Sequence, residues 1–503
     1  MEKLLYRPNI SKNGYTFLMA YPACESFALS SLGYMWLFKL ADEHSDINAH
    51  RIYTDSKDIV HNPEAIAFSM SFDFDFMGLF QILEKYSLSF LSNERDENAP
   101  LIFAGGPVIT TNPSLYSKIL DFMIIGDGED VFLKALDILK QRKPKIETLQ
   151  ELANIEGIYV PNISKKVKKA TETLSNVIYT PILNENSYFK DTFIIEVARG
   201  CMNRCAFCTA SYLNLPFRSY PYEKIIEVIE LGLKHTNKIA LLGAQISAHP
   251  DFNKIMQFLR NKIEQGESIE LGISSLRTDS VTPELVQTLV LGGQKKSTIA
   301  IEAASERLRK YINKNLKEEQ IFNAVRISRE NGLKGLKVYS MIGIPNETEA
   351  DIDEFLRLAR ALKSENKGFE ITFSFSSFVP KPQTPLQWSK REDTKSLEKK
   401  QKYLEKELAK IGVEAKFSSI KWDYWQTLLS RGDSRLTDFL IYVYQNGGKN
   451  GAYKTALKNL NDTELKAING FDLEDELPWD IVENYPPKQL LINEFNRLQK
   501  FAI

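Results

Sequence analysis

Several features that would point to a membrane, secreted or nucleic-acid-binding protein are scarce in this sequence. No apolar run approaches the roughly 20 residues needed to cross a bilayer, and residues 1–8 do not build a signal-peptide core. The 64 basic and 65 acidic side chains nearly cancel, so nucleic acid is not indicated as a partner. We therefore expect a cytoplasmic protein without a membrane segment, and its 503 residues suffice for two or three domains.

Cysteine and histidine are also scarce, which limits the ways in which the chain could hold a metal. Three of its four cysteines, Cys201, Cys205 and Cys208, form a C-x3-C-x2-C loop directly after an alternating apolar segment that predicts a strand. Spacing alone leaves a zinc site or a disulfide open. However, only Cys24 lies elsewhere, and no two of the five histidines form an H-x3-H pair. These counts favour an iron–sulfur cluster, and three protein ligands on a 4Fe-4S cube would leave one iron open.

The cysteine loop, with Phe207 just before its last cysteine, resembles the signature of the radical S-adenosylmethionine (radical SAM) superfamily. This resemblance implies that the open iron chelates S-adenosylmethionine. It also implies that one-electron reduction cleaves this cofactor to a 5'-deoxyadenosyl radical, which abstracts a hydrogen atom from the substrate. A further implied partner is an external reductant of the flavodoxin or ferredoxin type.

Residues 191–390 alternate strand and helix patterns at intervals typical of βα units. The predicted strands are 192–198, 238–243, 269–276, 297–303, 337–344 and 370–378. Six such units predict a partial (β/α)6 barrel that is open on one side, with functional residues at the carboxyl ends of its strands. The cysteine loop follows the first strand, so we expect the cluster at that edge.

The ends of the second and third barrel strands carry candidate cofactor contacts. Gly243 and Ala244 resemble a divergent form of the superfamily's G-G-E segment, whose main chain meets the methionyl ammonium of S-adenosylmethionine. A plain turn would also explain Gly243. Ser275 and Arg277 share one face of the third strand and could bind ribose hydroxyls or a carboxylate. The alternative for this pair is a solvated strand end.

The fourth and fifth strands carry the remaining candidates. Glu302 ends the fourth strand and needs a partner if it faces the barrel interior. The resemblance implies that Glu302 touches the ribose or amino end of S-adenosylmethionine and that Lys314 binds its methionyl carboxylate. A structural salt bridge between Glu302 and Arg309 is the competing interpretation. Gly343, in a G-x-P-x-E-T turn, would lie beside the adenine, where glycine permits close approach to a flat ring.

Residues 1–150 alternate short apolar strands with helical segments, which predicts a doubly wound parallel sheet. Such a domain ahead of the cysteine loop is similar to the cobalamin-binding domain of one uncharacterised radical SAM branch. Gly105 and Gly106 lie at its expected ligand edge, although turn chemistry alone explains them. The cobalt-ligating D-x-H-x-x-G motif is missing, because His44 lacks the glycine three residues later. Cobalamin is therefore a possible cofactor, held without a histidine ligand, or absent.

The remaining regions are predicted as a linker at 151–190 and a helical C-terminal domain at 391–503. The sequence thus predicts an α/β radical SAM enzyme with an unidentified substrate and no assignable acid, base or radical-quenching residue. Methyl transfer is favoured if cobalamin binds, whereas rearrangement, oxidation or sulfur insertion stays open without it. The alternative of another class is a non-catalytic iron–sulfur module that binds nucleic acid.

Overall fold

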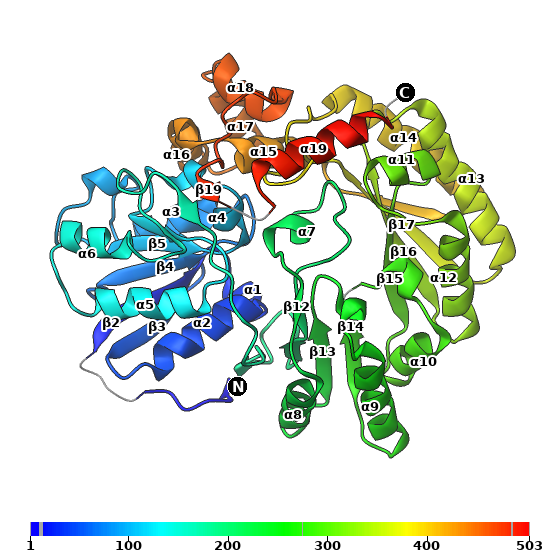
Figure 1. Ribbon diagram of the computed structural model, residues 1–503, viewed down its shortest axis with the longest axis horizontal. Coiled ribbons are helices and arrows are strands. Elements are labelled where there is room, and N and C mark those ends of the chain that lie inside the picture. Colours follow the sequence, from blue (N-terminus) through cyan, green and yellow to red (C-terminus); the bar gives the residue numbers. More distant parts are fainter. Residues whose placement is uncertain (1, 10–13, 274, 484–485, 502–503) are drawn as a thin grey trace.

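The computed structural model of the protein describes residues 2–9, 14–273, 275–483 and 486–501. An N-terminal α/β unit, in blue and cyan, lies beside an open half-barrel, in green and yellow, and the orange C-terminal helices pack above the junction (Figure 1). No helix in these described ranges is long and apolar enough to cross a membrane.

The N-terminal unit is built on a six-stranded sheet with the order β3-β2-β4-β5-β6-β7. The first five are parallel and the last is antiparallel. Their bounds are β2 Tyr15–Tyr21, β3 Ile47–Tyr53, β4 Ala65–Ser69, β5 Leu101–Gly105, β6 Phe122–Ile124 and β7 Ile158–Tyr159. Because the chain places β3 on one side of β2 and β4 on the other, a topological switch point lies between β2 and β4. The predicted doubly wound sheet is confirmed.

Helices cover both faces of this sheet because its strands are apolar on both sides. Phe17 and Met19 of β2 face the cluster formed with α2 (Leu32–Glu43) and α5 (Glu129–Leu139). The alternate residues Leu18 and Ala20 face α3 (Phe76–Lys85), α4 (Pro107–Thr111) and the C-terminal helices. The second cluster therefore joins the two ends of the chain in one core.

The half-barrel consists of two parallel sheets that meet at a narrow seam. One sheet has the order β10-β13-β14 and the other β15-β16-β17-β18. Among the described residues, a single bridge between Leu276 and Ile299 joins them, and the barrel is not closed. The strand bounds are β10 Phe193–Glu196, β13 Lys238–Leu242, β14 Glu270–Ile273, β15 Lys296–Glu302, β16 Gly335–Ile342, β17 Glu370–Ser377 and β18 Glu414–Phe417. All six predicted strands are present.

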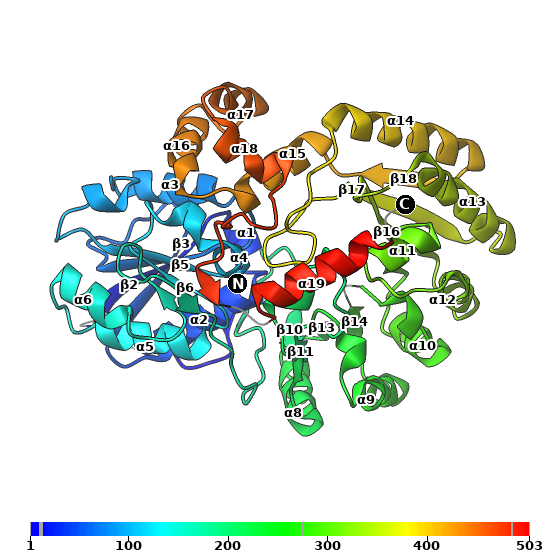
Figure 2. The same ribbon diagram turned by 45° about the horizontal axis from the view of Figure 1, so that its top comes forward.

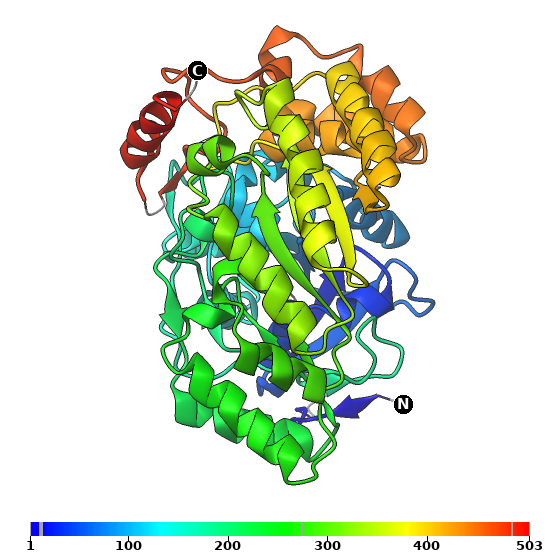
Figure 3. The same ribbon diagram turned by 90° about the vertical axis from the view of Figure 1, so that its right-hand side faces the viewer.

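Helices cover the convex side of this half-barrel, as the side view in Figure 3 shows. Their bounds are α8 Tyr222–Leu233, α9 Phe252–Glu264, α10 Pro283–Leu291, α11 Glu306–Tyr311, α12 Glu318–Glu330, α13 Glu349–Glu365 and α14 Thr394–Ile411. In β17, Phe373 and Phe375 join the core under these helices. The intervening Ser374 and Ser376 therefore face the concave side.

The C-terminal region is helical, as expected, with two additions. Its helices are α15 Ile420–Arg431, α16 Thr437–Gln445, α17 Asn450–Leu457, α18 Asp462–Asn469 and α19 Lys488–Gln499. The strand β18 extends the barrel sheet, and β19 (Val482–Glu483) pairs with β8 (Val167–Lys168). Figure 2 shows β18 beside β17; its charged and apolar residues alternate over only four positions, too few to have predicted a strand. The segment predicted as a linker contains β7, β8 and β9 (Ile182–Leu183); the boundaries at 150, 190 and 390 stay a prediction.

Candidate active site

The cysteine loop leaves the barrel after β10 and turns at Gly200. This glycine has a φ of +87°, and a Cβ there would lie 2.4 Å from the carbonyl oxygen of Asn214, so the turn excludes larger residues. Cys201 and Cys205 are 8% and 6% exposed, and Cys208 is partly buried. All three are free thiols. The fold thus gathers the predicted cluster ligands in one shielded loop.

The donor set fits an iron–sulfur cluster better than a single metal ion. Within the described part of the chain, no three His, Cys, Asp or Glu side chains are grouped so as to hold one ion. The thiolates of a cubane each bind a different iron, so they need not converge on one point. Burial raises the pKa of the Cys205 thiol to about 12. Thiolate ligation there would therefore release a proton that burial otherwise retains.

The end of the second barrel strand contacts the cysteine loop through Gln245, whereas the contact of Gly243 and Ala244 with the methionyl ammonium stays a prediction. Asn203 donates its amide to Gln245 Oε1 at 2.6 Å, and the Cys201 thiol lies 3.4 Å from the same oxygen. A Cβ on Gly243 would lie 3.0 Å from the Ala198 carbonyl oxygen, which limits this position to a small residue. Gln245 thus anchors the loop through its side chain.

Glu302 and Lys314 form a largely buried ion pair with a distance of 3.0 Å. Glu302 ends β15 with a φ of +66°, where the strand register shifts. Burial alone would lower the pKa of Lys314, but Glu302 raises it above its usual range. Arg309 instead donates to the carbonyls of Ala303, Ala304 and Leu316, so the competing salt bridge with Glu302 is absent from the described structure.

Two contacts bring this ion pair to the cysteine loop. The main-chain amide of Ala206 donates to the Ile312 carbonyl at 2.9 Å, and the Asn313 side chain donates to the Arg204 carbonyl at 2.8 Å. The charges of Lys314 and Glu302 act on the Cys205 thiol. A cation and a carboxylate therefore lie beside Cys205 in the cysteine loop. Their roles toward S-adenosylmethionine stay predictions.

The other predicted site residues differ in their surroundings. Phe207 packs on the apolar cluster that includes Ala206 and Tyr311. Ser275 is exposed, and Ser274 lies outside the described residues. Arg277 pairs with Asp279 at 2.6 Å, so its charge is already partly engaged.

Gly343 forms the turn after β16 and has a φ of +79°. Its amide donates to Glu347 Oε2 at 2.7 Å, and a Cβ would approach Leu397 Cδ2 at 2.6 Å. Burial raises the pKa of Glu347 to about 7, although Lys400 lies 2.6 Å away. The turn therefore requires glycine for its own packing, apart from any cofactor.

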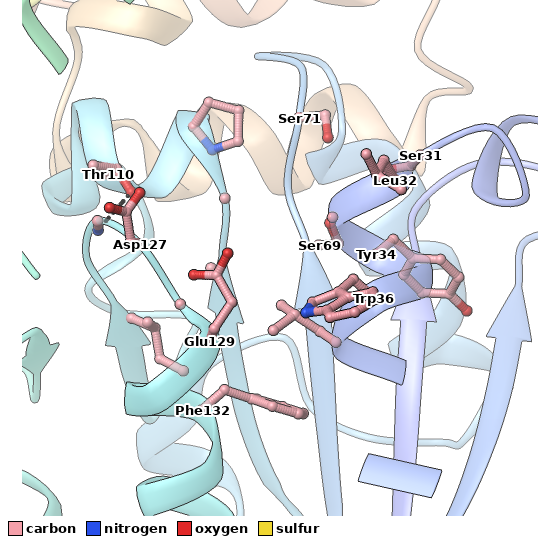
Figure 4. Close-up of a pocket in the computed structure, with 18 of the residues that line it drawn as sticks. Ser31, Leu32, Tyr34, Trp36, Ser69, Ser71, Thr110, Asp127, Glu129 and Phe132 are labelled. Carbon is pink, nitrogen blue, oxygen red and sulfur yellow. Dashed lines mark hydrogen bonds between the residues drawn. The ribbon is translucent and has the colours of Figure 1, made fainter. Parts of the chain in front are cut away.

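A cavity of about 360 Å³ lies at the carboxyl edge of the N-terminal sheet, at the switch point (Figure 4). Glycines at positions 33, 105, 106, 126 and 128 keep parts of its wall free of side chains. The remaining lining is mainly apolar and includes Trp36 and Phe132. His44 caps the opposite end of α2, where it lies 3.3 Å from Asp137, and it does not line this cavity.

An ionic network that the sequence did not reveal joins this cavity to the cysteine loop. Arg199, two residues before Cys201, lies 2.9 Å from Asp127, 2.7 Å from Glu129 and 2.8 Å from Glu196. Arg218 lies 2.6 Å from Asp127. Asp127 and Glu129 lie between β6 and the start of α5, at the carboxyl edge of the N-terminal sheet. Since the network joins residues far apart in the chain, no local pattern could show it.

Two family models match the chain. The model described as the radical SAM superfamily matches residues 195–359, and the model for the N-terminal region of radical SAM proteins matches residues 33–161. The chain belongs to the radical SAM superfamily. This radical SAM protein is also 30% identical over 432 residues to the uncharacterized protein MJ0966 of Methanocaldococcus jannaschii. The matched region covers 84% of this chain and 90% of the relative.

Two further similarities concern activity and fold. An uncharacterized methyltransferase, PH0819 of Pyrococcus horikoshii, is 25% identical over 321 residues, 60% of this radical SAM protein and 67% of the relative. The solved structure of the cobalamin-dependent S-adenosylmethionine radical enzyme OxsB, with aqua-cobalamin and S-adenosylmethionine bound, superposes with a TM-score of 0.57. It is 14% identical and covers 97% of this chain and 79% of its own, which shows a shared fold.

The predicted superfamily and fold class are therefore confirmed, and the protein is an enzyme of this superfamily. Membership implies a 4Fe-4S cluster and S-adenosylmethionine as cofactors, together with an external reductant. The substrate is not identified by these similarities.

Proposed function

We propose that this protein is a cobalamin-dependent radical SAM methyltransferase. The observation that carries the proposal is the position of the 360 Å³ cavity. Its wall is formed by the edge of the N-terminal sheet and by residues of the barrel near the cysteine loop. Those barrel residues are Glu196, Arg199, Leu213, Asn214 and Leu242. A cofactor in the cavity would therefore lie next to the cysteine loop. The relative described as a methyltransferase and the cobalamin-bound structural neighbour support this function.

The residues of the cavity fit a corrin. Flat macrocycles need open, apolar walls, which the five glycines and Phe132, Trp36 and Leu37 provide. Gly106 and Gly126 have φ values of +107° and +103°, and a Cβ at either would clash with backbone, so both positions require glycine. No histidine is among the residues that line the cavity, in keeping with a corrin held without a histidine ligand. When bound, cobalamin would supply a carrier for the methyl group.

Different residues of the chain would hold the iron–sulfur cluster and S-adenosylmethionine. Cys201, Cys205 and Cys208 would hold the cluster, and Lys314 would neutralise the methionyl carboxylate while Glu302 orients Lys314. Gly243 and Ala244 would present main-chain groups to the methionyl ammonium. Gly343 would give room for the adenine, with Ser275 and Arg277 near the ribose. We further propose that the enzyme works in the cytoplasm with a flavodoxin- or ferredoxin-type reductant.

Gly33 offers a direct test of the cavity. It is the second residue of α2, and a Cβ there would have no neighbour within 4 Å. The Gly33→Phe variant should therefore fold and fill the cavity. Gly451, the second residue of α17, has equally open space but does not line the cavity, so Gly451→Phe is the matched control.

The measurements are corrin absorbance, iron content and products after anaerobic reconstitution with hydroxocobalamin. We expect wild type and Gly451→Phe to retain corrin and Gly33→Phe to retain at least tenfold less, with equal iron. Methyl donation leaves S-adenosylhomocysteine, whereas radical generation leaves methionine and 5'-deoxyadenosine. Wild type that carries its cluster but retains no corrin would overturn the proposal and favour cobalamin-free rearrangement, oxidation or sulfur insertion.

A further inference from the structure

Two amide side chains face the sulfur of Cys201, and neither has a role in the function proposed above. Asn203 Nδ2 lies 3.4 Å from Cys201 Sγ and 2.6 Å from Gln245 Oε1, and this oxygen lies 3.4 Å from the same sulfur. We call Asn203 and Gln245 the amide pair. Asn203 belongs to the cysteine loop, whereas Gln245 follows β13. The amide pair therefore joins the loop to the barrel beside the first cysteine.

The chemistry of the amide pair keeps one N–H directed at this sulfur. A contact of 2.6 Å between two amides requires a nitrogen on one side and an oxygen on the other. Whichever residue supplies the nitrogen, that atom also lies about 3.4 Å from Cys201 Sγ, in position for a hydrogen bond to sulfur. The donor is therefore present in either orientation of the two amides.

The other two cysteines are stabilised by different groups. The charge of Lys314 acts on the Cys205 thiol, and the main-chain amide of Ser211 acts on the Cys208 thiol. In the described part of the chain, the side-chain hydrogen bonds of Cys201 are those with the amide pair. Cys201 is therefore the cluster ligand whose donor comes from uncharged side chains, and such a donor can be removed by substitution.

We propose that the amide pair donates an N–H to the Cys201 thiolate and thereby raises the reduction potential of the iron–sulfur cluster. A donor at a cluster sulfur has this effect because it stabilises the negative charge that arrives with the electron. In this step the flavodoxin- or ferredoxin-type reductant loses one electron and the cluster gains it, with no bond broken and no proton moved. Asn203 and Gln245 are thus positioning residues that act through Cys201.

This inference rests on one part of the proposed function, the assignment of the cluster to the three cysteines, and it is independent of cobalamin. Two single variants and their combination test it on the anaerobically reconstituted full-length protein without S-adenosylmethionine. In Asn203→Leu, the Gln245 nitrogen can still turn to the sulfur, and in Gln245→Leu, Asn203 Nδ2 remains. Only the double variant removes both donors.

The measurement is the ratio of reduced to oxidised cluster at a fixed solution potential, followed by electron paramagnetic resonance. We expect each single variant to change this ratio by less than about threefold, because one donor remains. The double variant should lower it about tenfold, which corresponds to about 59 mV for one electron. A double variant with the wild-type ratio would overturn the inference.

The matched control is an amide pair of the same kind on the convex helices. Gln287 Nε2 donates to Asn331 Oδ1 at 2.8 Å, between α10 and the end of α12. Replacement of both residues by leucine should leave the ratio unchanged. An equal fall in this control and in the double variant of the amide pair would assign the effect to lost stability and refute the proposed hydrogen bond.

A spectroscopic measurement detects the donor itself. Electron–nuclear double resonance of the reduced cluster, compared between light and heavy water, reports exchangeable protons close to the cluster. Wild type and both single variants should show a coupled exchangeable proton that the double variant lacks. Iron content shows that each sample carries its cluster. A double variant that keeps this proton signal would contradict the assignment.

The same samples separate this inference from the proposed function. Wild type that retains no corrin but differs from the double variant in potential refutes only the proposed methyltransferase. Wild type that retains corrin and has the same potential as the double variant refutes only the role of the amide pair. Wild type that carries no iron after reconstitution refutes both.

Discussion

Replacement of Arg199 by methionine should destabilise the junction between the N-terminal unit and the barrel. The guanidinium contacts three carboxylates at 2.7–2.9 Å, and the four side chains are 9–22% exposed. At an effective dielectric constant of about 20, each contact has a gross Coulomb energy of about 6 kcal/mol. Desolvation offsets much of this, and the measured loss for breaking a buried pair is about 3–5 kcal/mol. We expect a loss in that range in the free energy of unfolding.

The sign of the pH dependence gives a second check. Burial alone would raise the pKa of Asp127, but Arg199 and Arg218 together lower it. In the wild type, Asp127 therefore stabilises the fold above its unfolded pKa, and this contribution is lost as the pH falls through the folded pKa. In Arg199→Met, Asp127 keeps its ion pair with Arg218, whereas Glu129 and Glu196 lose the ion pair that they form with Arg199. They then favour protonation, and the variant loses more stability at pH 8 than at pH 5.5.

Urea denaturation at both pH values measures these effects, with Arg142→Met as the control. Arg142 also pairs with a carboxylate, that of Glu64, but its side chain is 53% exposed. An exposed pair contributes about 0–1 kcal/mol, so the control should lose little stability. Equal losses in the two variants, or a loss in Arg199→Met that does not depend on pH, would refute the electrostatic reasoning.

Three further variants test other parts of the site. Lys314→Met should weaken S-adenosylmethionine binding at least tenfold in calorimetric titrations, whereas Lys310→Met, at a side chain 58% exposed, should leave it unchanged. Gly343→Ala should cost about 1–2 kcal/mol more than Gly368→Ala in urea denaturation. Both glycines have a φ near +80°, but only the first would press a Cβ against a leucine methyl, so equal losses would exclude a steric cause. Burial raises the pKa of Glu347 to about 7, so its ionisation should lower wild-type stability as the pH rises from 5 to 8. Glu347→Gln should remove that slope, and an unchanged slope would assign it to other groups.

The regular elements followed from local patterns. The strand β15 alternates buried and more exposed residues over all seven of its positions, and such a period survives in any tertiary context. The exceptions are too short to show a period. The strand β18 alternates over only four residues, Glu-Ala-Lys-Phe, and pairs with the free edge of β17. The segments at β7 and β9 are two residues each and depend equally on distant partners.

The residues of the candidate site also fall into two groups, those that a local pattern predicts and those that only the tertiary structure brings together. Cys201, Cys205 and Cys208 lie within eight residues, so their spacing along the chain already gathers them in one loop. The closeness of Lys314 to Glu302 could be anticipated only from resemblance. The Arg199 network was not visible, because Glu129 lies 70 residues from Arg199 in the chain.

The sequence by itself determined the cysteine loop, the parallel strands and the glycine-lined edge of the N-terminal sheet, because each depends on residues close together in the chain. Only the tertiary structure decided that this edge and the cysteine loop face each other across Arg199. This arrangement arises from packing between units, where side chains from separate segments satisfy one another's charges and hydrogen bonds.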